Sequence, residues 1–399
     1  MRIPFARSPR SSVGIEWEIQ LVDRDSGDLR QAAQAVLAAM RRPDGSAQPG
    51  IVQEFLVNTV EIVTDPFASI PLAAAQIEQR LDLIRQAADP LRIDLLAAGG
   101  HPFARWELQE VTDKERYHRL IDRTQWWGRQ MVIYGVHTHV GIEDRRKVLP
   151  IVRALLCYLP HLQALSASSP YWAAQATGYA SNRALLFQQL PTAGLPIQFT
   201  TWDELEHYTG DMIHTGVIDV FSEIRWDIRP APRFGTVEVR VCDALPTLRE
   251  VAAVSALVQC LVEEFSGILD RGGELPSMPA WFVQENKWRS ARYGMDAIIV
   301  LNAFGDELLV TDHLPEVLTR LEPVAVGLGC LDELNYIHTM IRLGASYQRQ
   351  LAAAASSDGA AQAAGSDGAA NATSGDGLRT VVASLVAELA ANQPGPNPA

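Results

Sequence analysis

Segments typical of β-strands occur in groups along this chain, and a helix does not follow each of them. The clearest is Thr236–Asp243 (TVEVRVCD), in which apolar and polar residues alternate with the period of two of a half-buried strand. Grouped strands favour an antiparallel sheet with helices on one face over a parallel, doubly wound sheet. We therefore predict an α+β fold. Further strands are predicted at Val13–Val22, Glu54–Thr64, Leu95–Gly100 and Met131–Ile142, and long helices at Ile70–Asp94, Lys147–Ser166 and Leu248–Leu269.

The overall composition argues against several classes of protein. With 399 residues, 47% of them hydrophobic and 20% charged, the chain can bury a large core without disulfides. The net charge is −13 and no block of Lys or Arg occurs, so we expect neither nucleic acid nor a membrane surface as a partner. The four cysteines form no CxxC pair, which argues against structural zinc. Because there is no unbroken run of 18 apolar residues and no apolar stretch near Met1, we expect a cytoplasmic protein.

The last fifty residues differ from the rest, so we expect residues 1–351 to form a single domain. Residues 352–377 contain almost only Ala, Ser, Gly, Asp, Gln, Asn and Thr, which bury too little apolar surface to become ordered. We interpret them as a flexible low-complexity linker. From Leu378 to Ala391 apolar residues recur at helical spacing, and Pro394 and Pro396 follow. Residues 378–399 are therefore predicted to be a short amphipathic helix and a disordered tail.

Two of the predicted strands carry carboxylates among apolar residues. Glu16 and Glu18 (GIEWE) point to one face about 6–7 Å apart, where like charges repel unless a cation or basic group lies between them. Glu61 lies among β-branched residues in NTVEIV, with Glu54 seven positions earlier. An odd separation on a regular strand places two side chains on opposite faces. Glu54 and Glu61 can therefore reach one site only if a bulge or loop intervenes.

Three more segments add imidazole and guanidinium groups. His137 and His139 (VHTHV) share a face of one strand, and Glu238 and Arg240 (VEVR) share a face of another. The polar segment Gly178–Arg183 (GYASNR) contributes a second arginine. Each pattern alone is typical of an exposed strand face or of a cross-strand ion pair. Their recurrence on four apolar strands indicates one shared site.

The residue types of this predicted site suit a metal ion with a nucleotide. Carboxylate oxygens with an occasional imidazole favour Mg²⁺ or Mn²⁺ over zinc, and nearby arginines are typical of sites that hold nucleotide phosphates. The sequence has neither GxxxxGK[ST] nor a GxGxxG placed between a strand and a helix. We therefore expect any ATP to be bound by metal on the face of a sheet, and not by a P-loop.

Several long motifs, in order, are similar to those of one family. They resemble the bacterial carboxylate–amine ligases related to glutamate–cysteine ligase, the type-two glutamate–cysteine ligase family, over about residues 13–350. The resemblance implies a fold like that of glutamine synthetase and the guanidino kinases. In that fold a curved antiparallel sheet holds ATP and metal on its concave face and packs helices on its convex side. The motifs are GIEWEIQLVD, NTVEIVT, GGHPFARW, VHTHVGI, LSASSPYW with TGYASNR, WDIRPAPRFGTVEVRVCD and ENKWRSARYG.

The resemblance also implies roles for individual residues. Trp17 stands where many relatives have a third acid, but its position points to the opposite strand face, so the predicted cluster stays complete. The implied metal ligands are Glu16, Glu18, Glu54, Glu61, His137 and Glu238; Arg240 and His137 contact ATP, Arg240 and Glu238 are catalytic, and Tyr179, Arg183 and His139 bind the substrate.

The reaction implied by the resemblance is amide formation through an acyl phosphate. ATP is the co-substrate and Mg²⁺ or Mn²⁺ the cofactor, with glutamate as the carboxylate and cysteine as the amine. The products are then γ-glutamylcysteine, ADP and phosphate. The motifs specify the ATP end better than the amino-acid pockets, so a different pair of substrates, with weak glutamate–cysteine activity, stays open. A phosphotransferase of the guanidino kinase type, a non-catalytic nucleotide-binding relative and a homo-oligomer also stay open.

Overall fold

One antiparallel sheet organises the molecule. The computed structural model describes residues 1–363 and 375–395, and in this part of the chain seven strands pair in the order β10-β11-β5-β1-β3-β2, with β4 also paired to β1. Every pair in this sheet is antiparallel. The predicted α+β class with an antiparallel sheet is confirmed. The strands are β1 (Val13–Asp23), β2 (Ile51–Gln53), β3 (Thr59–Val63), β4 (Ile93–Leu96), β5 (Val136–Gly141), β10 (Ile228–Ala231) and β11 (Thr236–Val239).

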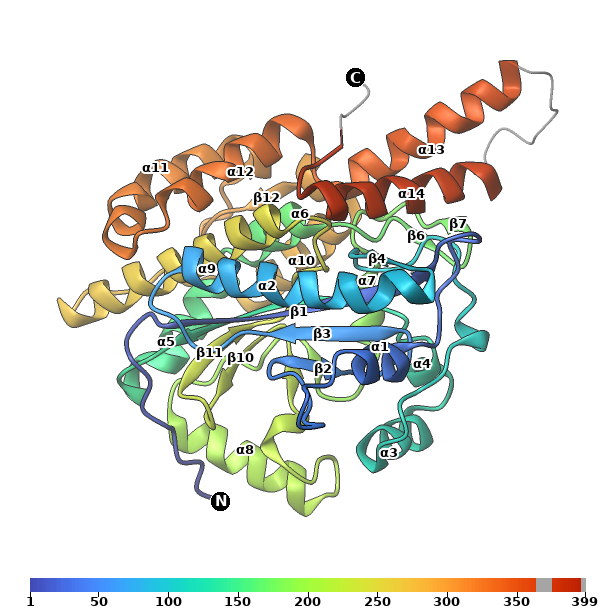
Figure 1. The fold of residues 1–399 in the computed structure, drawn as a ribbon. Coiled ribbons are helices and arrows are strands. Elements are labelled where there is room, and N and C mark those ends of the chain that lie inside the picture. Colours follow the sequence, from blue (N-terminus) through green and yellow to red (C-terminus); the bar gives the residue numbers. More distant parts are fainter. Residues whose placement is uncertain (364–374, 396–399) are drawn as a thin grey trace.

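The two faces of the sheet differ because side chains alternate along each strand. Along β1, Ile15, Trp17 and Ile19 are at most 1% exposed and belong to the main hydrophobic core. This face packs against α2 (Ile70–Ala88), α5 (Arg145–Leu156) and α9 (Leu248–Asp270), while Figure 1 shows α3 (Glu115–Thr124) and α8 (Trp202–His214) on the other side of the sheet. Trp17 therefore lies in the core, opposite the carboxylates of its own strand, as predicted.

Helix α9 is long and apolar enough to cross a membrane. However, 78% of its most apolar stretch is buried inside the fold, against α2, α5, α11 (Val310–Leu328) and α12 (Leu331–Leu343). Burial in the protein core accounts for its apolar character. The other α-helices before residue 346 are α1 (Ala33–Ala39), α4 (Trp126–Arg129), α6 (Leu159–Ser166), α7 (Asn182–Phe187) and α10 (Ala280–Tyr293). Strands of two or three residues outside the main sheet are β6 (Tyr171–Trp172), β7 (Gln175–Ala176), β8 (Ala193–Gly194), β9 (Arg225–Trp226), β12 (Ile298–Val300) and β13 (Glu307–Leu309).

Three predicted elements are divided differently in the structure. The expected helix over 147–166 is two helices, α5 and α6, bent by 61°. Pro160 at the start of α6 explains the break, because proline lacks the N–H that a continuous helix needs. The expected strand over 54–64 contains a turn before β3. The expected helix over 70–94 ends at Ala88, and a single 3₁₀ turn containing Pro90 leads into β4.

The C-terminal region is more ordered than the composition predicts. Helix α13 (Ser346–Ala363) continues through the first twelve residues of the predicted linker. Alanine side chains bury little apolar surface, but alanine has the highest helix propensity. The rest of the predicted linker, apart from residues 375–377, and the tail at 396–399 lie outside the described residues. The predicted amphipathic helix corresponds to α14 (Gly375–Ala391).

Helix α14 packs against α13 and β4 (Figure 1). A buried ion-pair network holds it there. Leu378, Val381 and Leu385 form a second apolar cluster with Val22 and Leu96 of the sheet. Next to this cluster, the guanidinium of Arg349 on α13 lies 2.9 Å from the carboxylates of both Glu388 on α14 and Glu250 on α9. The three side chains are at most 3% exposed.

Candidate metal and nucleotide site

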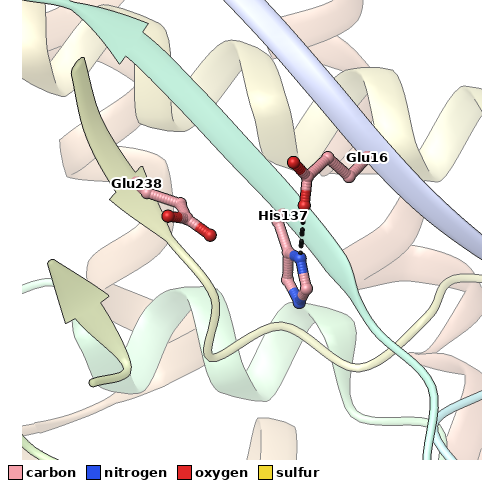
Figure 2. A group of neighbouring side chains, drawn as sticks. All are labelled: Glu16, His137 and Glu238. Carbon is pink, nitrogen blue, oxygen red and sulfur yellow. Dashed lines mark hydrogen bonds and ion pairs between the residues drawn. The ribbon is translucent and has the colours of Figure 1, made fainter. Parts of the chain in front are cut away.

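Three neighbouring strands bring potential metal ligands together on the polar face of the sheet. The strand register places Glu16 of β1 opposite His137 of β5, and Glu238 of β11 opposite His139. Figure 2 shows Glu16, His137 and Glu238 approaching one another from these strands. One ligand atom from each of the three lies within 4.8 Å of the other two. A single cation can reach all three at this spacing.

His137 has the protonation state of a metal ligand. Burial, and then the positive charge of Arg240, lower the pKa of His137 to about 4, so the ring is neutral at neutral pH. Its Nδ1 lies 2.9 Å from Oε2 of Glu16. When Nδ1 donates its hydrogen to Glu16, Nε2 keeps the lone pair. A histidine oriented by a carboxylate in this way is the usual arrangement in metal sites.

Glu16 remains ionised because two histidines face it. Its Oε1 lies 3.4 Å from Nε2 of His139, on the side away from His137. Burial alone would raise the pKa of Glu16, but hydrogen bonds from both histidines lower it well below its ordinary value. Burial likewise opposes a charge on His139, yet the carboxylates of Glu238 and Glu16 raise its pKa. His139 therefore links the two carboxylates.

A second group of carboxylates lies beside the first. Glu18 of β1 stands directly opposite Glu61 of β3. Burial raises the pKa of Glu18 to about 7, while burial and then the charges of Glu54, Glu16 and Glu18 raise that of Glu61 well above its ordinary value. Burial and mutual repulsion therefore disfavour the charged forms of these crowded carboxylates. A bound cation would relieve that repulsion, which is the behaviour expected of metal ligands.

Glu54 reaches this group from the turn between β2 and β3. The two strands form a hairpin, so a loop intervenes between Glu54 and Glu61, as their odd separation requires. Oε2 of Glu54 accepts a hydrogen bond of 3.0 Å from the hydroxyl of Tyr117 on α3. Glu54 is thus held toward Glu61 by a residue that the sequence patterns did not single out.

Arginines form the opposite side of the site. Both oxygens of the fully buried Glu238 are bonded, Oε2 to Nε of Arg229 at 2.7 Å and Oε1 to Nη1 of Arg240. Although burial opposes it, Arg240 and then Arg229 lower the pKa of Glu238, which is therefore ionised. Nη1 of Arg240 also lies 3.5 Å from Nδ1 of His137, and its buried Nε has no hydrogen-bond partner among the described residues. A donor left unused in this position suits an anionic ligand.

The predicted substrate residue Arg183 joins this group. Its Nη1 donates to the backbone carbonyls of Arg240 and Val241 at 3.2 and 3.3 Å. A Cβ on Gly135 would lie 2.1 Å from Nη2 of Arg183, so only glycine allows the guanidinium to approach β5 this closely. The loop before Arg183 is fixed by Asp243, whose carboxylate accepts hydrogen bonds from Ser169 at 2.7 Å and Ser181 at 2.8 Å.

Carboxylates and guanidiniums face one another across a cavity of about 480 Å³. Two of the predicted substrate residues are not among the residues that line it. Tyr179 lies beside Arg292, with the guanidinium carbon 5.7 Å from the ring centroid, and His139 lines a separate cavity of about 210 Å³ with Phe234. The lining residues include Glu16, Glu18, Glu54, Glu61, His137, Arg183, Arg225, Arg229 and Arg240.

The sequence patterns missed four arginines of the cavity, which are Arg116 and Arg119 on α3, Arg225 and Arg229. Arg229 lies in WDIRPAPRFG and its strand partner is Glu238, so a hairpin drawn from β10 to β11 would have revealed it. Arg225 belongs to the two-residue strand β9, which is too short for alternation to indicate a face.

Magnesium should raise the melting temperature of the protein, because a ligand that binds only the folded state stabilises it by about 2.7 kcal/mol at 100 times its Kd. The shift should largely disappear in Glu61→Gln, which removes a carboxylate from the most crowded part of the site. Glu274→Gln alters an exposed carboxylate that lines neither cavity and should keep the full shift. Thermal unfolding with and without MgCl₂ measures the shift in melting temperature of each variant. Equal shifts in the two variants would contradict a metal site here.

Known proteins match nearly the whole chain. Glutamate–cysteine ligase family 2 matches residues 12–371. A protein of Arthrobacter sp. strain FB24 with the provisional name glutamate–cysteine ligase 2-1 is 57% identical over 364 residues, 90% of this chain and 95% of its own length. A protein of Mycobacterium bovis strain BCG with the provisional name glutamate–cysteine ligase 2 is 52% identical over 388 residues, 97% of each chain.

The fold is also shared with a solved structure. The crystal structure of glutamate–cysteine ligase from Francisella tularensis in complex with AMP aligns with a TM-score of 0.66 and 14% identity, over 97% of this chain and 94% of the other. The predicted family and the predicted enzyme class, an ATP-dependent carboxylate–amine ligase, are confirmed by the sequence matches. The chain therefore belongs to glutamate–cysteine ligase family 2.

Proposed function

We propose that this protein joins the γ-carboxylate of glutamate to the amino group of cysteine while ATP is converted to ADP and phosphate. The observation that carries the proposal is the division of the 480 Å³ cavity into a carboxylate side and a guanidinium side. The carboxylate side can hold the metal of a metal–ATP complex. The guanidinium side can hold phosphoryl and carboxylate oxygens. The proposed location is the cytoplasm.

Mg²⁺ or Mn²⁺ would be held by Glu16 and His137 together with the crowded carboxylates of Glu18, Glu54 and Glu61. These residues fit the ion because their oxygens are hard donors, their carboxylates crowd one another, and the neutral ring of His137 has a lone pair on Nε2 when Nδ1 donates to Glu16. A bound ion would draw charge from the ATP phosphates. Both carboxylate oxygens of Glu238 are bonded to Arg229 and Arg240, so we propose that Glu238 positions these arginines and does not bind the ion.

In the first step, an oxygen of the glutamate γ-carboxylate attacks the γ-phosphorus of ATP, and the bond from that phosphorus to the bridging oxygen breaks. The products are an acyl phosphate and ADP. Arg240 is placed to donate hydrogen bonds to the transferring phosphoryl oxygens, since its Nε is unused and it lies next to His137. Little covalent assistance is needed when the reactants are aligned and the charge is stabilised.

In the second step, the amino group of cysteine attacks the acyl carbon. The tetrahedral intermediate collapses, the carbon–oxygen bond to phosphate breaks, and the amide remains. The amine loses a proton in this step, and the departing phosphate takes it up and leaves as hydrogen phosphate. Arg183 and Arg240, whose positions are tied together by the hydrogen bonds of Arg183 to the Arg240 carbonyl, are the groups placed to stabilise the departing phosphate.

Purified protein given Mg-ATP, glutamate and cysteine should release ADP and γ-glutamylcysteine only when both amino acids are present. A coupled ADP assay and product mass measure this directly. ADP release that needs an acid but no amine would instead indicate a phosphotransferase. Binding of Mg-ATP without turnover over a panel of acid and amine pairs would indicate a non-catalytic relative. Turnover with a different pair would keep the chemistry and replace the named substrates.

A further inference from the structure

A second arginine-lined cavity, of about 430 Å³, adjoins the carboxylate–guanidinium cavity. Five residues line both cavities and mark the boundary between them: Arg116, Arg119, Leu120, Glu223 and Arg225. Of the three arginines, Arg119 is paired with Asp219 at 2.6 Å and Arg116 lies 3.9 Å from Glu54.

The backbone of Arg225 is fixed: β9 pairs in parallel with β8, and the Arg225 amide donates to the carbonyl of Thr192 at 3.0 Å. The adjacent Trp226 is buried in the core. These contacts hold the backbone of Arg225 at the boundary, where its side chain can reach a ligand that spans both cavities.

The guanidinium of Arg225 lacks the counter-ion that its neighbours have. Arg229 lies 2.7 Å from the carboxylate of Glu238, and the salt bridges among the described residues include no acid within 4.0 Å of Arg225. Its only side-chain hydrogen bond in that part of the chain goes from Nη1 to the backbone carbonyl of Glu223, at 2.9 Å. Burial, opposed by Glu223 and assisted by Arg240 and Arg229, lowers the pKa of Arg225 to about 10. The group is still charged at neutral pH, and a bound anion would stabilise it.

The position of Arg225 separates it from the phosphate chemistry. The metal-site carboxylates line the larger cavity and not the second one. An anion at Arg225 can therefore extend away from the reacting groups, as the non-reacting end of a substrate does. A guanidinium presents parallel N–H groups that match the two oxygens of a carboxylate.

We propose that Arg225 binds the α-carboxylate of an amino-acid substrate and so positions that substrate for reaction. This inference rests on the proposed function, in which both glutamate and cysteine carry such a group beyond the atoms that react. Either amino acid can supply the α-carboxylate, and decarboxylated analogues distinguish them. 4-Aminobutyrate is glutamate without its α-carboxylate, and cysteamine is cysteine without its carboxylate.

Arg225→Leu should raise the KM of one amino acid about 10- to 100-fold, the range for loss of a hydrogen bond to a charged group, and should leave the KM of ATP within about twofold. The wild-type enzyme should prefer that amino acid over its decarboxylated analogue by a similar factor, and the variant should lose the preference. The pair for which the preference is lost identifies which substrate Arg225 binds. Arg225→Lys keeps the charge but not the paired donors. Its KM for that amino acid, and its preference over the analogue, should lie between those of the wild type and of Arg225→Leu.

Arg342→Leu serves as the matched control, because Arg342 is an exposed arginine of α12 that lines neither cavity. A raised KM for ATP in Arg225→Leu, or an unchanged preference for both amino acids, would overturn the assignment. Turnover of glutamate and cysteine by the wild type is measured first. Absence of that turnover would contradict the proposed function, whereas the variant tests only the role of Arg225. Calorimetric titration of glutamate, cysteine and the two analogues into protein bound to a non-hydrolysable ATP analogue tests the assignment without turnover.

Discussion

Arg240→Lys should lower kcat for ADP release by about 10²- to 10³-fold, equivalent to about 3–4 kcal/mol, the usual loss when one donor to the transition state is removed. In the structure the side chain of Arg240 is 15% exposed, bonded to Glu238 and close to His137, and its Nε has no hydrogen-bond partner among the described residues. These features describe a preorganised donor facing the place where charge develops. Lysine keeps the positive charge but offers a single nitrogen on a different stem, so it cannot serve Glu238 and a phosphoryl group together.

Arg229→Lys provides the comparison for this prediction. Arg229 binds the same carboxylate through Nε, and its Nη1 already donates to the backbone carbonyls of Ser222 and Ile224. Its replacement should therefore cost less activity than that of Arg240. Initial rates at saturating substrate give kcat for both variants, and the melting temperature reports whether each remains folded. A loss in Arg229→Lys as large as in Arg240→Lys would show that the free donors of Arg240 are not what matters.

Lys287→Met should destabilise the protein by about 3–5 kcal/mol, because it leaves a buried carboxylate without its partner. Nζ of Lys287 on α10 lies 2.6 Å from Oδ2 of Asp227, and both side chains are 3% exposed. Asp227 sits between β9 and β10, and its carbonyl accepts the backbone N–H of Arg240 at 2.7 Å. The ion pair therefore connects the ENKWRSARYG helix to the strands that carry Arg225 and Arg229, and to Arg240 directly after β11.

Urea denaturation followed by tryptophan fluorescence measures this loss. The double variant Lys287→Met/Asp227→Leu should recover most of the stability, because replacing both members of a buried pair by apolar residues is often close to neutral. A loss below about 1 kcal/mol in the single variant would contradict the view that Asp227 depends on Lys287. Failure of the double variant to recover would show that Asp227 makes its main contribution through the backbone.

Alternation predicts which face a residue occupies but not which strand lies beside it. The faces of Glu16, Glu18 and Trp17 could be read from the sequence because strand side chains have a period of two. The contact between Glu16 and His137 joins positions 121 apart in the chain. It follows from the order of strands in the sheet, which local patterns do not encode. The family resemblance, and not the local pattern, predicted that these residues share one site.

Two predicted elements differ from the structure for the same reason: hydrophobicity patterns do not contain the backbone preferences of proline and alanine. The periodicity over 147–166 continues through the bend, and only the missing N–H of Pro160 shows that two helices are present. The alanines after residue 351 look featureless by hydrophobicity, yet alanine is the strongest helix former. Arg225 and Lys287 could not be predicted for a different reason. The neighbours that define their roles come from segments far away in the sequence.

The packing of α14 has a consequence for how the protein is made. Leu96 of β4 and Gly375, where α14 begins, are separated by 279 positions. At about 5–20 residues per second, synthesis of the intervening chain takes roughly 15–55 s. During that time the apolar surface that β4 and β1 present to α14 has no cover from it. Glu388 can reach Arg349 only after this interval, so the nascent chain depends on α14, or on a chaperone in its place, to keep this surface from associating with other chains.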